Sequence, residues 1–208
     1  MLDFSNSKIL IVGDVMLDKY YFGKVDRISP AAPVPIVNIQ KEESRLGGAS
    51  NVANNIVSLG GHSLLCGVIG HDLFGKEIER ISRHKNIDTF LLKTSSPTIT
   101  KARIIGGKQQ IVRVDYEDKS ELNADNKKLF RDTISRILPE YDILVISDYG
   151  KGLISEDLCR YLIKLAHKYD KKVIIDPKGK NWEKYSGADI VTPNVKELSD
   201  IVGYTVPN

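Results

Sequence analysis

The chain has 208 residues, of which 41% are hydrophobic and 27% charged, and its formal net charge at pH 7 is +3. This composition is typical of a globular protein with one large core, and the interleaved charges form no basic stripe of the kind that binds nucleic acid. No apolar run is long enough to span a bilayer and no signal-peptide pattern is present, so we expect a cytoplasmic protein that contacts neither membrane nor nucleic acid.

Cysteine and histidine usage argues against a metal site. Cys66 and Cys159 lie in apolar runs, so we expect buried free thiols in a reducing compartment. The four histidines are scattered without the spacing of metal ligands.

The first element is a short apolar run over 9–12 that ends at Gly13, as a buried parallel strand does where it enters a loop. Asp14 and Asp18 follow it, and carboxylates there can accept hydrogen bonds from sugar hydroxyls or cap a turn. The segments 20–26 and 35–39 flank a proline-rich corner. Because proline does not serve a central strand, we expect exposed strands of a small accessory sheet.

A glycine pair, Gly47-Gly48, runs directly into an amphipathic helix. Adjacent glycines let the backbone adopt positive φ and approach a ligand that a Cβ would repel. Asn51 lies in the first turn of this helix, where its amide can bind the hydroxyls of a polyol. A glycine turn capped by Ser50 explains the local sequence equally well. The apolar positions of the helix share one stripe: Val52, Ile56 and Leu59.

The segments that follow predict a second buried strand over 63–69 and a helix over 74–83. The segment 70–76 between them has the glycine and lysine spacing of a P-loop. Glu77 stands where serine or threonine must meet magnesium, so we reject a P-loop and interpret Asp72 as a helix N-cap.

A hairpin is predicted next, with strands over 98–105 and 109–115 around Gly106-Gly107. We expect it to join the accessory sheet. The α/β alternation then resumes with a helix over 125–137, strand 143–147, helix 155–169, strand 173–175, strand 190–191 and a helix from Val195 to Gly203.

Three strand ends carry polar loops, at 148–152, 176–179 and 192–197, where a doubly wound sheet places its site. Lys151 and Lys178 can neutralise a transferring phosphoryl group. Asn194 and Glu197 share a helix face, where the carboxylate can hold magnesium through water or complete a capping box.

These motifs resemble the ribokinase-like carbohydrate kinases of the phosphofructokinase B type. Residues 47–53, with Gly60 and Gly70 downstream, match the first signature of that family. Within it the chain is most similar to the heptose 7-phosphate kinases, and the resemblance covers essentially the whole chain. The segments that carry it are 13–20, 27–30, 32–35, 147–152 and 176–179. Ala31 departs from the pattern, because the heptose kinases typically carry glutamate there.

The resemblance implies a Rossmann-like three-layer α/β/α fold, with one kinase domain over 1–208 and a small β lid formed by about 19–40 and 98–116. It implies phosphorylation of D-glycero-β-D-manno-heptose 7-phosphate at the anomeric hydroxyl, with ATP and Mg²⁺, on the way to ADP-heptose. It also implies a lid that often pairs in a homodimer.

The site residues that the resemblance and the loops indicate fall into two groups. The substrate group comprises Asp14, Asp18, Gly47, Gly48, Asn51, Arg113, Asp148, Lys151 and Lys178. The ATP group comprises Asn194, Val195, Lys196 and Glu197, with Glu197 holding Mg²⁺ through water.

The family's second signature, a glycine-rich turn followed by the catalytic aspartate, is not found, since no Gly-Ala-Gly-Asp sequence occurs in the 208 residues. We expect it beyond Asn208, so that this polypeptide is incomplete at the C-terminal side of the fold and inactive alone. An uncovered sheet edge predicts association through that edge or the lid. The alternatives are a catalytically dead module that binds sugar phosphates, or a relative acting on fructose, ribose or a nucleoside.

Overall fold

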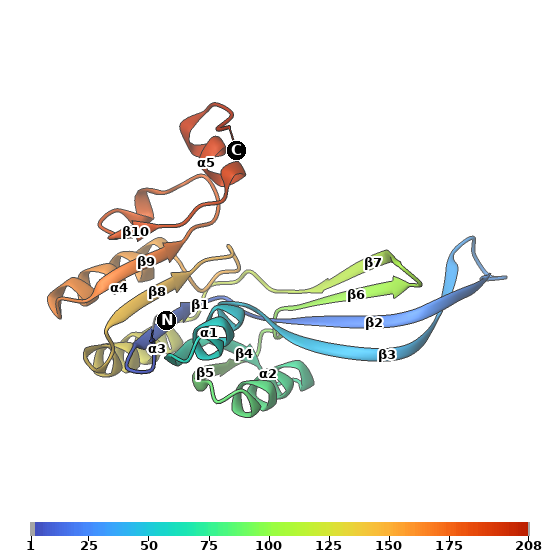
Figure 1. The fold of residues 1–208 in the computed structure, drawn as a ribbon, viewed down its shortest axis with the longest axis horizontal. Coiled ribbons are helices and arrows are strands. Elements are labelled where there is room, and N and C mark those ends of the chain that lie inside the picture. The colour runs from blue at the N-terminus through green and yellow to red at the C-terminus, as the bar shows by residue number, and fades with distance from the viewer. Residues whose placement is uncertain (1–2, 208) are drawn as a thin grey trace.

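Six parallel strands form the central sheet of the computed structural model, which describes residues 3–207 (Figure 1). Their order is β10-β9-β8-β1-β4-β5. β1 lies inside the sheet, and its residues Leu10, Ile11 and Val12 are fully buried, which explains their unbroken apolar run. The strands are β1 (Lys8–Gly13), β4 (His62–Gly70), β5 (Asp88–Thr94), β8 (Ile143–Ser147), β9 (Lys172–Asp176) and β10 (Ile190–Val191).

Helices cover both faces of this sheet, because alternate residues of each strand point to opposite sides. Leu10 and Val12 join the core cluster of α3 (Ala124–Ile137) and α4 (Glu156–Lys168). Ile11 joins the cluster of α1 (Ala49–Ser58) and α2 (Leu73–His84). Short 3₁₀ turns lie at Leu138–Glu140 and Glu183–Tyr185, and α5 (Val195–Val202) ends at the left-handed Gly203. The predicted three-layer fold is confirmed.

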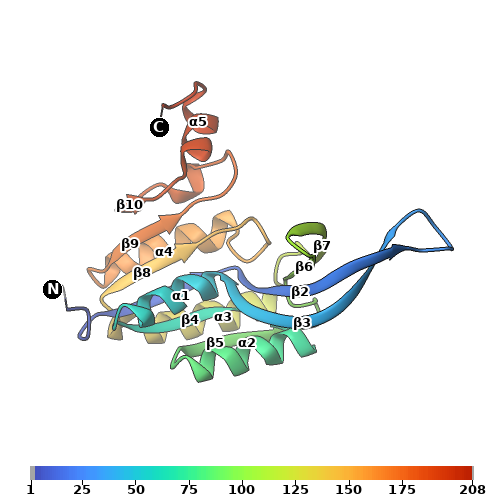
Figure 2. The same ribbon diagram turned by 45° about the vertical axis from the view of Figure 1, so that its right-hand side comes forward.

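A second sheet projects from the core as a long arm, which we call the lid (Figures 1 and 2). Its order is β3-β2-β6-β7, with β2 parallel to β6 and the two outer pairs antiparallel. The predicted hairpin therefore joins the accessory sheet. The strands are β2 (Val15–Ile28), β3 (Pro35–Gly48), β6 (Thr100–Gly106) and β7 (Gln109–Tyr116).

The glycine-led helix differs from the sequence interpretation at Ser50 and at Leu59. Gly48, not Ser50, is the N-cap of α1, and no side chain caps it. Ser50 is buried in the first turn, where its hydroxyl donates to the Gly47 carbonyl at 2.6 Å. Of the predicted apolar stripe, Val52 and Ile56 pack partly buried against the core, whereas Leu59 is 66% exposed at the end of the helix. The small residues Ala49 and Ala53 are fully buried. Small residues let α1 lie close against the sheet.

The two thiols are buried and free, as predicted. Burial raises the pKa of Cys159 to about 12 and also raises the pKa of Cys66. Within residues 3–207, no helix is long and apolar enough to cross a membrane.

Asp72 connects α2 to the chain that enters the lid. Its carboxylate accepts from the Gly75 amide at 2.8 Å, as the predicted N-cap, and from the amide and hydroxyl of Thr98 at 2.8 and 2.7 Å. Burial alone would raise the pKa of Asp72, but these donors more than offset it and the pKa is lowered from 3.8.

Asp72→Ala is expected to destabilise the protein by about 1–2 kcal/mol at pH 7, because the change removes a helix cap. The pKa of Asp72 is lower in the folded protein than in the unfolded chain. The ionised carboxylate therefore stabilises the fold at any pH above the unfolded-state pKa, and this stabilisation is lost as the pH falls through the folded-state pKa. Urea unfolding measures both effects. A deficit that persists unchanged at a pH below the folded-state pKa would contradict the role of the ionised carboxylate.

Candidate active site

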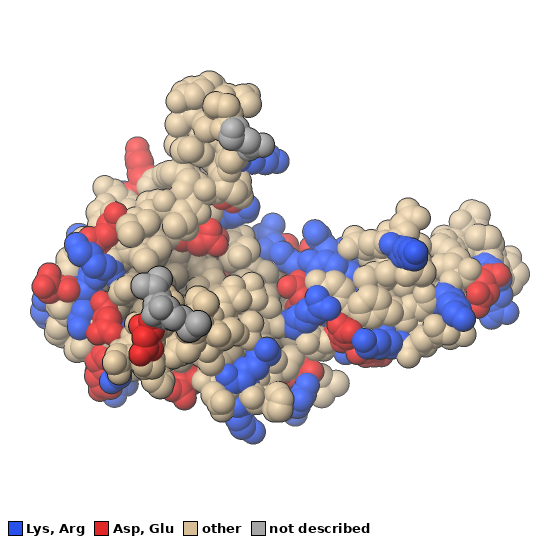
Figure 3. All heavy atoms as spheres, in the orientation of Figure 1, with Lys and Arg blue, Asp and Glu red and all other residues tan. Residues whose placement is uncertain are grey.

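Two clefts lie at the carboxyl ends of the parallel strands and the root of the lid, and Tyr149 lines both. Figure 3 shows the surface hollowed between the C-terminal arm and the lid, with Lys and Arg side chains gathered where the lid leaves the core. The cleft lined by Gly47 and Gly48, which we call the glycine cleft, has a volume of about 720 Å³. The cleft lined by Lys178, which we call the lysine cleft, has a volume of about 300 Å³.

The glycine cleft contains four of the predicted residues: Asp18, Gly47, Gly48 and Asn51. A Cβ on Gly48, whose φ is +55°, would lie 2.4 Å from the Asp14 carbonyl oxygen. A Cβ on Gly47 would lie 2.5 Å from Asp18 Oδ2. The glycine pair therefore lets the end of β3 pack directly against the start of β2 and keeps this wall of the cleft free of side chains.

Basic side chains that sequence reasoning missed also line the glycine cleft: Arg45, Lys85, Lys101 and Arg103. Arg103 forms an ion pair with Asp18 at 2.6 Å, and Arg45 and Arg103 lie over the ring of Tyr20 at 4.8 and 5.2 Å. Among residues 3–207, Lys101 has no carboxylate within 4.0 Å. Burial and the nearby Lys151 lower its pKa. The cleft thus has positive charge left to bind an anion.

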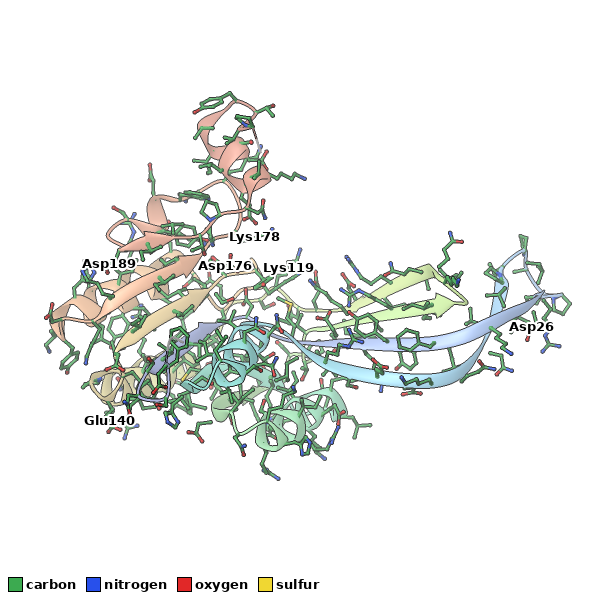
Figure 4. The ribbon with its side chains drawn as sticks, viewed as in Figure 1. Asp26, Lys119, Glu140, Asp176, Lys178 and Asp189 are labelled. Atoms are coloured by element: carbon green, nitrogen blue, oxygen red, sulfur yellow. The ribbon has the colours of Figure 1, made fainter. Side chains whose placement is uncertain are left out.

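The lysine cleft brings together Asp176, Lys178, Asn194 and Glu197, with the first two labelled in Figure 4. Glu197 Oε1 accepts from Lys178 Nζ at 2.8 Å, while its Oε2 accepts from the Asn194 amide at 3.0 Å. The predicted capping box is therefore present, and it leaves one carboxylate oxygen directed at Lys178. Burial raises the pKa of Asp176, and the neighbouring Glu197 adds to that effect.

Val195 and Lys196 do not line the lysine cleft. They occupy the first turn of α5 and are exposed. Among the described residues no group of three or more His, Cys, Asp and Glu side chains is placed to hold a metal. A cation in the lysine cleft would therefore depend on Glu197 or Asp176 together with its own water and a bound phosphate, which is the manner typical of Mg²⁺.

Asp14 lies elsewhere than the sequence led us to expect. It is 2% exposed and does not line the glycine cleft. Its Oδ2 accepts from the amides of Tyr149 at 2.8 Å and Lys151 at 3.1 Å, and burial raises its pKa. Asp14 therefore fixes the loop after β8, which carries Tyr149 into both clefts.

Asp148, a predicted substrate residue, lines the lysine cleft and is buried by its own hydrogen bonds. Its Oδ2 accepts from Lys184 Nζ at 2.5 Å and the Tyr185 hydroxyl at 2.7 Å, and its Oδ1 from the Gly150 amide. The Tyr185 oxygen in turn accepts from the Lys178 amide at 2.9 Å. Asp148 thus connects the β8 loop to the loop that carries Lys178. Sequence offered no signal for Lys184 or Tyr185, since both lie in a short 3₁₀ turn.

Two predicted phosphate contacts are not in either cleft. Lys151 forms an ion pair with Glu117, and its amide binds Asp14. Arg113 lies on β7 opposite Arg103, where it pairs with Asp115 at 2.8 Å and stays half exposed. Three other lid cations line the glycine cleft instead: Lys101 and Arg103 on β6, and Arg45 on β3.

Comparison with known proteins shows the family of the chain. A profile described as pfkB family carbohydrate kinase matches residues 6–206. The chain is 47% identical over 193 residues to the bifunctional protein HldE of Helicobacter pylori, covering 92% of this chain and 42% of that protein. It is 44% identical over 200 residues to a D-beta-D-heptose 7-phosphate kinase of Bordetella bronchiseptica, covering 96% and 63%.

The chain therefore spans less than two thirds of the length of either relative. Among solved structures, the tetrameric inhibited form of phosphofructokinase-2 from Escherichia coli superimposes with a TM-score of 0.76 at 20% identity, over 97% of this chain and 66% of that one. That likeness shows the shared fold. Because the family profile matches nearly the whole described chain, the predicted membership is confirmed and the chain belongs to the pfkB family of carbohydrate kinases.

Proposed function

We propose that this protein phosphorylates D-glycero-β-D-manno-heptose 7-phosphate at its anomeric hydroxyl, with ATP and Mg²⁺ as cosubstrates. The observation that carries the proposal is the glycine cleft, where hydroxyl-binding groups and cationic side chains face the same space. Among residues 3–207, Lys101 has no carboxylate partner to neutralise it, whereas Arg103 is paired with Asp18. Asp18 and Asn51 suit sugar hydroxyls, and Lys101 and Arg103 suit a phosphate. The name of one relative, a D-beta-D-heptose 7-phosphate kinase, supports the same substrate.

The lysine cleft suits the nucleotide phosphates. Lys178 supplies a positive charge for a transferring phosphoryl group, and Glu197 supplies a carboxylate for hydrated Mg²⁺. When bound, the metal ion would offset the negative charge of the phosphates. Tyr149 lies between the clefts, so a sugar hydroxyl in one could face a phosphate in the other.

Transfer needs a base to take the proton of the attacking hydroxyl, which contributes about 10²–10⁴-fold to such reactions. The 208 residues contain no Gly-Ala-Gly-Asp turn to supply it. We therefore propose that this polypeptide binds the sugar phosphate but turns it over only when a segment with that turn is supplied. The buried free thiols fit a reducing compartment, so we place the reaction in the cytoplasm.

We also propose that a second copy of the chain pairs with the lid. One lid face exposes apolar side chains around a shallow cavity, including Val34, Ile39 and Val112, at 51%, 39% and 44% exposure. Such a patch is costly to leave in water. Sedimentation at micromolar concentration is expected to show a dimer, and a well-behaved monomer would contradict it.

Calorimetric titration with heptose 7-phosphate, the unphosphorylated heptose and fructose 6-phosphate tests the substrate. Lys101→Met is expected to weaken binding of heptose 7-phosphate about 10–100-fold, because one charge-assisted hydrogen bond is lost, and to leave the unphosphorylated heptose unchanged. Lys164→Met, an exposed change on α4, is the matched control.

Tighter binding of fructose 6-phosphate than of heptose 7-phosphate would replace the proposed substrate. An equal loss of affinity for the phosphorylated and the unphosphorylated heptose in Lys101→Met would show that Lys101 does not contact the phosphate. Tight binding without turnover, even when a polypeptide bearing the glycine-rich turn is added, would favour a catalytically dead binding module.

A further inference from the structure

A third cavity, of about 340 Å³, lies where the chain crosses between core and lid, and we call it the hinge cavity. Residues of three crossing segments line it: Asp14 and Val15 where β1 passes into β2, residues within 94–99 from the end of β5 to β6, and residues within 118–123 between β7 and α3. Figure 1 shows these connections at the root of the lid, and Figure 4 marks one of them at Lys119. The hinge cavity shares no lining residue with the glycine or lysine cleft.

Two buried polar atoms of residues that line this cavity have no hydrogen-bond partner within the described part of the chain: Asp14 Oδ1 and Thr94 Oγ1. Buried polar atoms are nearly always satisfied, so each one that is not points to a missing partner. For Asp14 the cost is large, because its carboxylate is 2% exposed and its other oxygen is already used by the β8 loop. The ionised Asp14 Oδ1 is an acceptor, so a donor in the cavity would satisfy it.

The charges of the cavity favour a cation. Its ionisable lining residues are Asp14, Asp118, Glu121 and Lys151. Lys151 is paired with Glu117, and Glu121 with Lys127. Asp118 accepts only from hydroxyls and one amide, those of Ser96 and Ser120. The carboxylates of Asp14 and Asp118 therefore have no counter-charge among the described residues. Their negative charge disfavours an anionic ligand.

The rest of the wall is mixed. Hydroxyl and amide side chains form its polar part: Thr94, Ser95, Ser96, Ser120, Asn123 and Asn126. Aliphatic side chains form its apolar part: Val15, Val68, Ile69, Ile99, Leu122 and Leu153. A ligand that fits both parts carries a positive donor at one end and a short hydrocarbon chain at the other. A fully hydrated metal ion would gain nothing from the apolar part of this wall, and among residues 3–207 no side-chain cluster with metal-ligand geometry is present.

We propose that the hinge cavity binds a small primary ammonium ion with a short apolar chain, which donates to Asp14 Oδ1 and joins the three crossing segments. Because Asp14 also holds the amides of Tyr149 and Lys151, the same carboxylate links this site to the loop that enters both clefts. A bound cation would favour the ionised form of Asp14, whose pKa is raised by burial. Occupancy of the hinge cavity thereby stabilises one position of the lid and of the β8 loop.

Calorimetric titration of the protein with n-butylammonium and with n-butanol tests the site, because the two probes share their chain and differ in charge. Saturable binding of the ammonium ion, about tenfold or more tighter than any binding of the alcohol, is expected. Asp118→Asn and Thr94→Val are each expected to weaken it about threefold to tenfold. Asp26→Asn, the same charge change at the exposed lid tip in Figure 4, is the control and is expected to leave it unchanged.

Amide hydrogen exchange then locates the bound ion. Slower exchange at 94–99 and 118–123 on addition of n-butylammonium supports the hinge cavity, and slower exchange confined to other segments overturns it. Equal binding of the alcohol, absence of saturation, or unchanged affinity in both Asp118→Asn and Thr94→Val would also overturn it. Thermal unfolding of each variant confirms that a lost affinity is not a lost fold.

Discussion

Gly48→Ala is expected to destabilise the protein by about 3 kcal/mol and to abolish measurable binding of the sugar phosphate. Gly48 has φ 55° and ψ −137°, a combination that is essentially restricted to glycine. The new Cβ would also lie 2.4 Å from the Asp14 carbonyl oxygen, which accepts the first amide of α1 at 3.0 Å. Relief of that contact requires β2 and α1 to separate, and both form walls of the glycine cleft.

Gly60→Ala is the matched control for this change. Gly60 also has positive φ, at +91°, but a Cβ there meets no atom within 4 Å. Its alanine variant therefore measures backbone strain alone, about 1 kcal/mol, with unchanged binding. Urea unfolding and calorimetry on both variants compare the two positions. A Gly48 variant no less stable than the Gly60 variant, with binding intact, would show that close approach at Gly48 is not needed.

Asp148→Ala is expected to cost about 3–5 kcal/mol, because it removes the carboxylate that neutralises the Lys184 ammonium and accepts from the Tyr185 hydroxyl. The acceptors that remain are neutral carbonyls, of Ile154 for Lys184 and of Lys178 for Tyr185. The Asp148 side chain is 1% exposed and that of Lys184 is 16% exposed, so solvent screens the pair weakly. The loop that carries Lys178 depends on Tyr185, and we therefore expect nucleotide binding to weaken as well. Chemical denaturation and titration with Mg-ATP measure the two effects.

A double-mutant cycle with Lys184→Met separates the ion pair from packing. The double variant is expected to be more stable than Asp148→Ala alone, because the stranded charge is gone. Asp189→Ala, which removes a carboxylate outside both clefts, is the control for nucleotide binding and is expected to leave it unchanged. Strictly additive losses in the cycle would mean that Asp148 and Lys184 do not interact in solution.

The sequence predicted most buried strands because their apolar runs are continuous. The strands at 143–147 and 190–191 were confirmed to the residue. β5 was missed, since Asp88–Thr94 lies at the edge of the sheet, is half buried and has no regular alternation of apolar and polar residues. β2 and β3 extend farther than expected because the proline-rich corner lies between them rather than ending them.

The sequence predicted the cleft residues that are close neighbours along the chain, because one turn or cap places them together. Gly47, Gly48 and Asn51 are neighbours in one turn, and Asn194 and Glu197 share one capping box. The prediction failed for side chains whose positions depend on contacts with distant parts of the sequence. Asp14 turns away from the glycine cleft to bind amides 135 and 137 residues farther along the chain, and only the assembled sheet brings them together. Arg113 and Lys101 both lie on the lid, but β7 is the edge strand and β6 is not.

A crystal structure of the protein with heptose 7-phosphate and a non-hydrolysable ATP analogue is the most direct test that the two clefts form one site. We expect the sugar against Gly47, Gly48 and Asn51, its phosphate within hydrogen-bond distance of Lys101 or Arg103, and the nucleotide phosphates beside Lys178. A sugar phosphate bound on any other surface, with the glycine cleft filled by solvent, would contradict the account.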